Sequence, residues 1–387
     1  MRVLFITSRP FWPPRKGEQA RLVGLLTHLP REFTVATLAF VPPGTKAIPA
    51  PLPFPQGFLP LSVWSAAWSS LSQPLWPTQV AIHYRKSLIP SVRQTLAQFR
   101  PDAVVFMLSR TAWLLHHITS VPCFVDFVDS LSLNIRHRAK AAPLTAAFWL
   151  WESFRCAHWD KLVLQRATLG TVVSERDRQA IVGDSPELAG KLAVLPFGVV
   201  PKETLLPRPA NPPVLLLSGN LGYYPTAGGA LWFANCIWPQ LKKLYPKVRL
   251  VMAGARPGKK ILRLSARGIE VVPDPEDLAP FREQATLSIA PLLPGSGAPI
   301  KVLEAMASGL PVVASPAAVA GLDELPPEAI SVATRGEEWV GAIAQLLDDP
   351  QRAARQAEAA FHWVRGRHEL TRVTQAFADL LRQAAGA

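Results

Sequence analysis

The chain has 387 residues, more than the roughly 100–200 of a typical domain, so we expect two domains. Hydrophobic residues make up 49% of the sequence and charged residues 18%, a balance that excludes an intrinsically disordered chain. The formal net charge of +13, most of it in residues 1–205, indicates an anionic partner such as phosphate groups, nucleic acid or an acidic membrane surface. A general basic bias without a specific partner is the alternative.

The cysteines and the N-terminal sequence indicate a cytoplasmic protein. Cys123, Cys156 and Cys236 are far apart and odd in number, which argues against a disulfide framework and against a four-cysteine zinc site. The first residues lack a long apolar stretch followed by a small-residue cleavage site, so we predict no signal peptide. Peripheral attachment to the inner membrane face remains an open alternative to a free cytoplasmic protein.

The sequence also predicts no membrane-spanning helix. No window contains the roughly 18–20 uninterrupted apolar residues that such a helix needs. The nearest candidate is AAPLTAAFWLW at 141–151, which is too short and is followed by charged residues. We expect a buried helix at this position, and the alternative is a helix that lies on a membrane surface.

The first half of the chain alternates between predicted strands and helices. A strand at 3–7 and a helix at 18–29 precede a strand at 33–40, and the three form a βαβ unit. Residues 41–77 are rich in proline, which prevents a regular helix or a central strand, and their tryptophans either pack on the domain or hold an apolar ligand. Further strands are expected at 103–107, 123–128, 171–173 and 193–195, and further helices at 82–99, 143–159 and 175–182.

A second alternation follows the proline-rich stretch PKETLLPRPANPP at 201–213, whose composition is typical of a linker. Strands are expected at 214–217, 248–252, 270–272, 287–291 and 312–314, and helices at 226–244, 259–266, 276–285 and 300–308. The tail at 337–385 is predicted to hold about three helices. Two such sets predict an α/β protein with two doubly wound sheets, which bind ligands at the carboxyl ends of their strands.

The most informative stretch is GSGAPIKVLEAMASGLPVVAS at 295–315, where a glycine loop runs into a helix. Proline suits the first turn at Pro299, and the free N–H groups of that turn attract an anion. Lys301 would add a positive charge, and Glu304 on the same helix face would accept hydrogen bonds from paired hydroxyls such as those of a ribose. The alternative is an ordinary surface pair between Lys301 and Glu304.

This stretch, with its core KVLEAMASGLPVVAS, resembles the glycosyltransferases of the GT-B fold, family 4. Three further stretches agree in order, and together they span most of the chain: PFWPPRKGEQARLVGLLTHL, TVVSERDRQAI followed by VLPFGVV, and SGNLGYYPTAGGALWFANCIWPQL. The last of these is similar to the entry of the donor domain in a branch linked to exopolysaccharide assembly.

The resemblance implies a GT-B architecture, in which two Rossmann-like domains face a central cleft. The implied domains are an N-terminal acceptor-side domain at 1–200, a linker at 201–213, a donor domain at 214–364, and a final helix at 365–387 that packs back on the N-terminal domain. The implied reaction moves a sugar, with retention, from a UDP- or GDP-sugar to a polysaccharide or lipid-linked acceptor. Neither a metal nor a cofactor is expected, and the sequence contains no metal-ligand cluster.

The resemblance also assigns candidate residues for donor binding: Gly17, Gly219, Asn220, Ser296, Gly297, Lys301 and Glu304. Two positions depart from the family pattern, because Ser296 stands where a glutamate is common and Phe197 stands where an asparagine is common. These departures motivate a second hypothesis, a binding or scaffold protein on a degenerate GT-B frame. A sugar-nucleotide epimerase on the same frame is a third, whereas the loop TSRPFWPPRKG lacks the G-x-G-x-x-G pattern of NAD(P) oxidoreductases.

The N-terminal half offers candidates for the acceptor side. Asp129 follows a predicted strand, where it would contact an acceptor hydroxyl or the donor sugar, or cap the next segment. Arg15, Lys16 and Arg21, together with Arg9, surround the first loop and would meet an acceptor phosphate or a lipid headgroup, or remain solvated. The basic residues are not interleaved with regularly spaced aromatics, so we expect no nucleic-acid partner.

Overall fold

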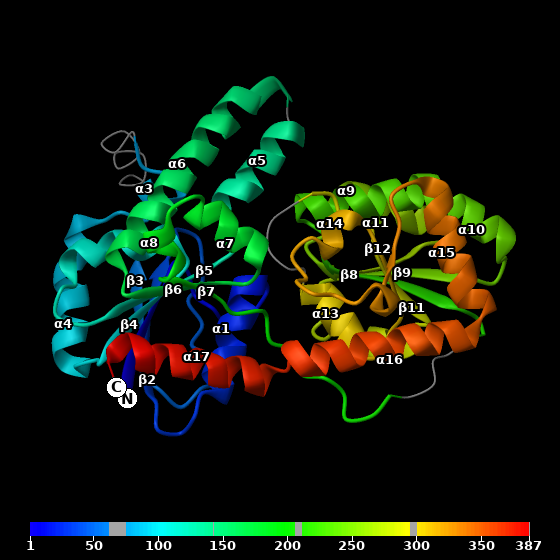
Figure 1. The fold of residues 1–387 in the computed structure, drawn as a ribbon. Coiled ribbons are helices and arrows are strands. Elements are labelled where there is room, and N and C mark those ends of the chain that lie inside the picture. Colours follow the sequence, from blue (N-terminus) through cyan, green and yellow to red (C-terminus); the bar gives the residue numbers. More distant parts are fainter. Residues whose placement is uncertain (62–74, 142, 206–210, 295–299, 387) are drawn as a thin grey trace. The chain divides into compact units, whose positions relative to one another are not determined.

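The computed structural model describes residues 1–61, 75–141, 143–205, 211–294 and 300–386 (Figure 1). The chain divides into two compact units. The first unit comprises Met1–Pro196 and Leu370–Ala387, and the second comprises Phe197–Glu369. Each unit is built around one parallel sheet, so the predicted α/β fold class is confirmed.

The first unit contains a parallel sheet with the strand order β3-β2-β1-β4-β5-β6-β7. The strands are β1 (Arg2–Thr7), β2 (Thr34–Val41), β3 (Gln56–Pro60), β4 (Ala103–Met107), β5 (Cys123–Val128), β6 (Leu169–Val172) and β7 (Leu192–Val194). The central strands β1, β4 and β5 are largely apolar and are buried along almost their whole length, with Asp126 a buried polar exception in β5. Such strands are typical of a parallel sheet that is covered on both faces.

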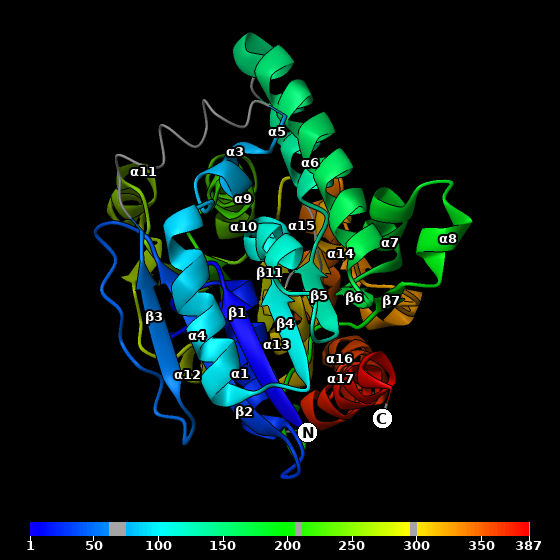
Figure 2. The same ribbon diagram turned by 90° about the vertical axis from the view of Figure 1, so that its left-hand side faces the viewer.

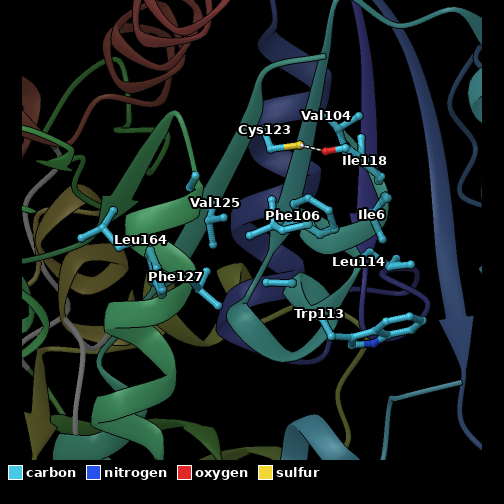
Figure 3. Packing of buried hydrophobic residues seen from close by; sticks show 14 of the residues in the cluster. Ile6, Val104, Phe106, Trp113, Leu114, Ile118, Cys123, Val125, Phe127 and Leu164 are labelled. Atoms are coloured by element: carbon cyan, nitrogen blue, oxygen red, sulfur yellow. Dashed lines mark hydrogen bonds between the residues drawn. The ribbon is translucent and has the colours of Figure 1, made fainter. Parts of the chain in front are cut away.

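Helices cover both faces of this sheet. They are α1 (Gly17–His28), α3 (Thr78–Ala81), η1 (Lys86–Leu88), α4 (Ile89–Phe99), η2 (Ser109–His117), α5 (Leu131–Ala141), η3 (Pro143–Thr145), α6 (Ala146–Arg166), α7 (Glu175–Val182), α8 (Pro186–Ala189) and α17 (Leu370–Ala385). Figure 3 shows the core on one face, where Phe106 and Phe127 of the sheet lie among side chains from η2 and α6. On the other face Phe377 of α17 packs against Phe5 of β1 and Phe124 of β5, with ring centroids 6.2 and 5.4 Å apart.

The second unit contains a parallel sheet with the strand order β10-β9-β8-β11-β12-β13. Its strands are β8 (Val214–Asn220), β9 (Arg249–Ala255), β10 (Glu270–Pro273), β11 (Leu287–Ala290), β12 (Val312–Ala314) and β13 (Ser331–Val332). Its helices are α9 (Tyr224–Trp232), the π-helical η4 (Phe233–Ile237), α10 (Trp238–Leu244), α11 (Lys259–Leu262), η5 (Arg263–Arg267), α12 (Ala279–Gln284), α13 (Ile300–Ala307), α14 (Pro316–Val319), η6 (Pro327–Ala329), α15 (Gly336–Asp348) and α16 (Pro350–Arg367). The core includes Phe233 and Trp339, whose rings meet edge to face at 5.8 Å.

Several predicted boundaries were wrong, and prolines explain most of the differences. The helix predicted at 82–99 begins at Ile89, because Pro90 occupies its first turn and the residues before it form separate short turns. The helix predicted at 143–159 begins after a 3₁₀ turn at Pro143 and continues to Arg166. A short strand, β3, lies within the proline-rich segment 41–77 at the sheet edge, where proline is tolerated.

The segment that connects the two sheets belongs to the second unit from Phe197 onward. This boundary lies before residue 200, where we expected the first domain to end. Within the predicted linker 201–213, the backbone N–H of Lys202 donates to the Ala307 carbonyl at 3.0 Å, and its ammonium pairs with Glu283 at 2.9 Å. Residues 206–210 of that linker lie outside the described residues.

Candidate functional site

The candidate site lies in the second unit at the carboxyl ends of β8 and β11. These neighbouring strands form the topological switch point of the sheet, because β9 and β10 follow β8 on one side while β11 lies on the other. In open parallel sheets the loops at this point diverge and leave room for a ligand. The loop after β8 leads into α9, and the segment after β11 leads into α13.

Lys301 lies in the first turn of α13, and its ammonium points to the start of α9. The Nζ atom donates a hydrogen bond to Thr226 Oγ1 at 2.6 Å. Burial lowers the pKa of Lys301 to about 8, whereas the charge of Glu304 raises it. A partly buried ammonium at a helix N-terminus is disfavoured both by desolvation and by the helix dipole, so the site holds positive charge at a cost in stability.

Gly219 provides the space that the Lys301 side chain occupies. Its φ of +123° lies in a region that side chains with a Cβ rarely adopt. A Cβ on Gly219 would lie 3.2 Å from Lys301 Nζ and 3.3 Å from Cδ and Cε. The neighbouring strand also approaches closely, because a Cβ on Gly254 would lie 1.7 Å from the Gly219 carbonyl oxygen. Gly219 and Gly254 therefore leave the space in which the Lys301 side chain lies.

Asn220 ends β8 and turns the chain toward α9. Its Oδ1 accepts a hydrogen bond from the Gly222 N–H at 3.1 Å, and its carbonyl accepts one from the Tyr223 N–H at 3.1 Å. This is an Asx turn, which an asparagine side chain stabilises locally. Asn220 therefore stabilises the loop, because its side-chain oxygen is bonded to the Gly222 N–H.

Glu304 lies one turn after Lys301 but pairs with a different residue. Its Oε2 atom lies 3.3 Å from Nη1 of Arg282 on α12. Burial raises the pKa of Glu304, while the charges of Arg282 and Lys301 lower it. The alternative of a Lys301–Glu304 surface pair is not seen, because the two charges interact without forming an ion pair and bond to different partners.

The remaining predicted residues are divided between the first unit and the undescribed segment. Ser296 and Gly297 lie outside the described residues. Gly17 is the first residue of α1, Lys16 precedes it, and Arg15 is exposed, with its N–H donating to Gln19 Oε1 at 3.0 Å. Gly17 thus lies in the first unit, whereas the other described donor candidates lie in the second.

Arg21 and Asp129 have different surroundings. Arg21 does not face solvent. It is buried, its Nε donates to Asp126 Oδ2 at 2.7 Å, and its Nη1 donates to the Pro196 carbonyl at 2.8 Å. The solvated alternative for Arg21 is therefore wrong, and its acceptor-side role stays a prediction for a guanidinium that a buried carboxylate already engages. Asp129 follows β5 directly and is partly buried.

Sequence reasoning missed the contacts that Thr226 and Arg282 make. Thr226 was placed only as the start of a predicted helix, and Arg282 only as part of another. Their partners Lys301 and Glu304 are remote in sequence, so no local pattern reveals these contacts. Among the described residues, no group of three or more His, Cys, Asp or Glu side chains is placed to hold a metal ion. None of the described helices is long and apolar enough to cross a membrane.

Known proteins resemble this chain both in the sequence around the site and in the overall fold. Residues 212–349 match the family model described as "Glycosyl transferases group 1". A search of curated proteins found no match. Solved structures resemble the whole chain, and the likeness is to GT-B glycosyltransferases. The predicted GT-B fold is therefore confirmed.

Three solved structures illustrate the likeness, each at 16% sequence identity. Sucrose-phosphate synthase from Thermosynechococcus elongatus has a TM-score of 0.74, with 99% of each chain covered. HepE from Anabaena in complex with UDP-glucose has a TM-score of 0.68, with 99% of this chain and 100% of that chain covered. WaaG, a glycosyltransferase involved in lipopolysaccharide biosynthesis, has a TM-score of 0.66, with 98% and 99% covered.

Proposed function

We propose that this protein is a retaining glycosyltransferase of family 4 that uses a UDP- or GDP-sugar as its donor. The observation that carries the proposal is the desolvated Lys301 ammonium, held beside Gly219 at the switch point of the second sheet. The family match over residues 212–349 covers this site, and the similar structure of HepE was solved with UDP and with UDP-glucose. We favour UDP for that reason.

The site residues suit the departure of a nucleoside diphosphate. As the bond from the sugar to the diphosphate breaks, negative charge develops on the leaving oxygen, and a preorganised cation stabilises that charge. Lys301 would supply it without a metal ion. Glu304, which is fixed by Arg282, would accept hydrogen bonds from the ribose hydroxyls. Asp129 of the first unit remains the candidate for contacts with the acceptor hydroxyl or the donor sugar.

The acceptor that we propose is a growing polysaccharide or a lipid-linked glycan at an anionic membrane surface. The paired helices α5 and α6 project from the sheet of the first unit (Figures 1 and 2). On α6, Phe148, Trp151 and Phe154 are 50%, 49% and 64% exposed. Arg136 and Lys140 on α5 are exposed as well. Exposed aromatic side chains on one helix and exposed basic ones on the helix packed against it are typical of surfaces that bind anionic membranes.

Titration of the protein with UDP, GDP and ADP tests the donor assignment. We expect Lys301→Met to weaken UDP binding by about tenfold or more, because the ammonium–phosphate contact is charge-assisted. Lys243→Gln, at an exposed position on α10, is the matched control and should bind as the wild type does. Equal UDP affinity in the Lys301→Met and wild-type proteins would contradict the proposal.

Product analysis separates the proposal from its two rivals. Incubation with UDP-glucose and lipid-linked glycan acceptors should release UDP and extend the glycan. A scaffold protein would bind the nucleotide but transfer nothing, and an epimerase would isomerise the donor without any acceptor.

Sedimentation with lipid vesicles tests the membrane contact. We expect binding to phosphatidylglycerol vesicles and not to phosphatidylcholine vesicles. The double variant Trp151→Ser with Phe154→Ser should lose this binding, whereas Leu262→Ser, which alters an exposed residue of the second unit, should keep it. Absence of the wild-type protein from the anionic vesicle pellet would refute the contact.

A further inference from the structure

The sheet of the first unit has a switch point of its own, and two arginines lie there. Its strand order places β1 next to β4, so the loops after these strands lead to opposite sides of the sheet. Arg9 follows β1, and Arg110 follows β4 within η2. By the same rule that locates the site in the second unit, a ligand of the first unit is expected between these two loops.

Arg110 makes no hydrogen bond and no ion pair in the part of the chain that the structure describes. Its Nε atom is buried without a partner. Burial and the positive charge of Arg9 lower the pKa of Arg110 to about 10, although the charges of Glu18 and Asp129 act in the opposite direction. The guanidinium therefore stays charged at neutral pH, desolvated and next to a like charge, which is an unfavourable arrangement unless an anion joins it.

Arg9 is also incompletely neutralised. Its Nε atom lies 3.7 Å from Glu18 Oε1, which is too long for a hydrogen bond, and this nitrogen is buried without a partner. Each guanidinium carries five N–H donors in a planar arrangement, and this geometry matches the oxygens of phosphate and carboxylate groups.

The other titratable groups around Arg110 offset only part of its charge. Burial raises the pKa of Asp160 to about 7, so this carboxyl is only partly ionised near neutral pH, and its Oδ1 accepts a hydrogen bond from Ser109 Oγ at 2.7 Å. Burial lowers the pKa of His83 to about 4, which leaves its imidazole neutral. Asp129 is partly buried and contributes a negative charge that raises the pKa of Arg110.

We propose that Arg110 and Arg9 bind an oxyanion, a phosphate or a carboxylate, carried by the acceptor substrate. The acceptor glycan of the transferase would then carry a phosphate group or an acidic sugar at the end that enters this site. The statement that the ligand is the acceptor rests on the proposed function. The existence of the anion site does not depend on the proposed function. Arg21 is not part of the proposed anion site, because its guanidinium already pairs with Asp126.

Calorimetric titration at low ionic strength with UDP present tests the proposal. The probes are glucose 6-phosphate, glucuronate, inorganic phosphate and neutral glucose. We expect at least one anionic probe to bind, and glucose to bind at least about tenfold more weakly. Preference for glucose 6-phosphate and phosphate would identify a phosphate site, and preference for glucuronate a carboxylate site. Equal binding of glucose and both anionic sugars, or no binding of any anion, would overturn the proposal.

Variants of Arg110 distinguish a ligand-binding role from a structural one. Arg110→Gln should abolish anion binding and leave the melting temperature unchanged or higher, because it removes a buried charge that has no partner. Arg110→Lys should keep part of the binding, and Arg93→Gln on the exposed face of α4 should keep all of it. A lower melting temperature for Arg110→Gln together with unchanged anion binding would show that Arg110 is structural.

UDP titration of the same samples separates this inference from the proposed function. If UDP binds but no anion does, the inference fails while the donor assignment stands. If anions bind but UDP does not, the anion site stands and the proposed function fails.

Discussion

Lys301 carries a proton whose loss would change what the site binds. The pKa of Lys301 is lowered from 10.5 to about 8 by burial, so the free protein holds the ammonium below about pH 8 and loses it above. A neutral amine attracts a diphosphate far less, and UDP affinity should therefore fall as the pH rises from about 7 to about 9.5. Calorimetry across this range measures the effect.

The variant Lys301→Met supplies the control for this pH dependence. It has no titrating group at this position, so its weak UDP binding should be flat across the same range. A wild-type profile that is equally flat would show that Lys301 does not contact the diphosphate.

Glu304 offers a sharper test than loss of binding alone. If its carboxylate accepts hydrogen bonds from the ribose, wild-type protein should bind UDP about tenfold more tightly than 2′,3′-dideoxy-UDP, which lacks both hydroxyls. Glu304→Ala should bind the two nucleotides alike, as a double-mutant cycle requires for a direct contact. A variant that weakens both ligands equally would point instead to a structural pairing of Glu304 with Arg282.

The positions of side chains could be predicted where the residues are close in sequence. The helix start at 300, its lysine and its glutamate are close in sequence, so periodicity and capping rules place them together. The Arg21–Asp126 pair could not be predicted in this way, because its members are 105 residues apart and either residue alone fits a surface role. The lack of a bonded partner for Arg110 among the described residues left no signal in the sequence either, since it depends on how the chain folds.

At the scale of elements, apolar runs predicted the strands well and the helix ends poorly. Residues 103–107, 123–128 and 312–314 are strands as predicted, because a strand buried on both faces needs a mostly apolar run, which Asp126 interrupts only once. Helix α5, in contrast, was missed. Its sequence LSLNIRHRAKA has few apolar residues, and the helix gains much of its stability by packing on α6.

The turn between β8 and α9 depends on Gly219. Gly219→Ala would force a side chain into a φ of +123° and push a methyl group against the Lys301 side chain. We expect a loss of roughly 1–3 kcal/mol in the free energy of unfolding and weaker UDP binding. Denaturant titration and calorimetry measure the two effects.

Gly341→Ala is the matched control, because Gly341 lies within α15 with open space around the added Cβ. This change should stabilise the protein by about 0.5–1 kcal/mol and leave UDP binding unchanged. If Gly219→Ala behaved in the same way as this control, the glycine would not be required for the Lys301 site.

At the scale of the whole molecule, the sequence predicted the two sheets but not where their charged residues lie. Two α/β sets separated by a proline-rich segment were enough to predict two parallel sheets, because each βαβ repeat closes on its own core. The basic excess in residues 1–205 was read as a sign of an anionic partner, and the structure places Arg9 and Arg110 of that region at one switch point. The composition gives the net positive charge of this region, but the strand order is needed to show that Arg9 and Arg110 lie at the same edge of the sheet.

The final helix ties the C-terminus to the first unit, and Phe377 is its main anchor. The ring is fully buried between Phe5 and Phe124, so Phe377→Ala should cost about 3–5 kcal/mol through lost contacts and a cavity. Because the second unit has its own core, the loss should appear in scanning calorimetry as a lowered transition of the first unit, while the transition that UDP raises stays in place. Arg372→Ala, on the exposed face of the same helix, should shift neither transition. A single transition that falls as a whole would show that α17 stabilises both units together.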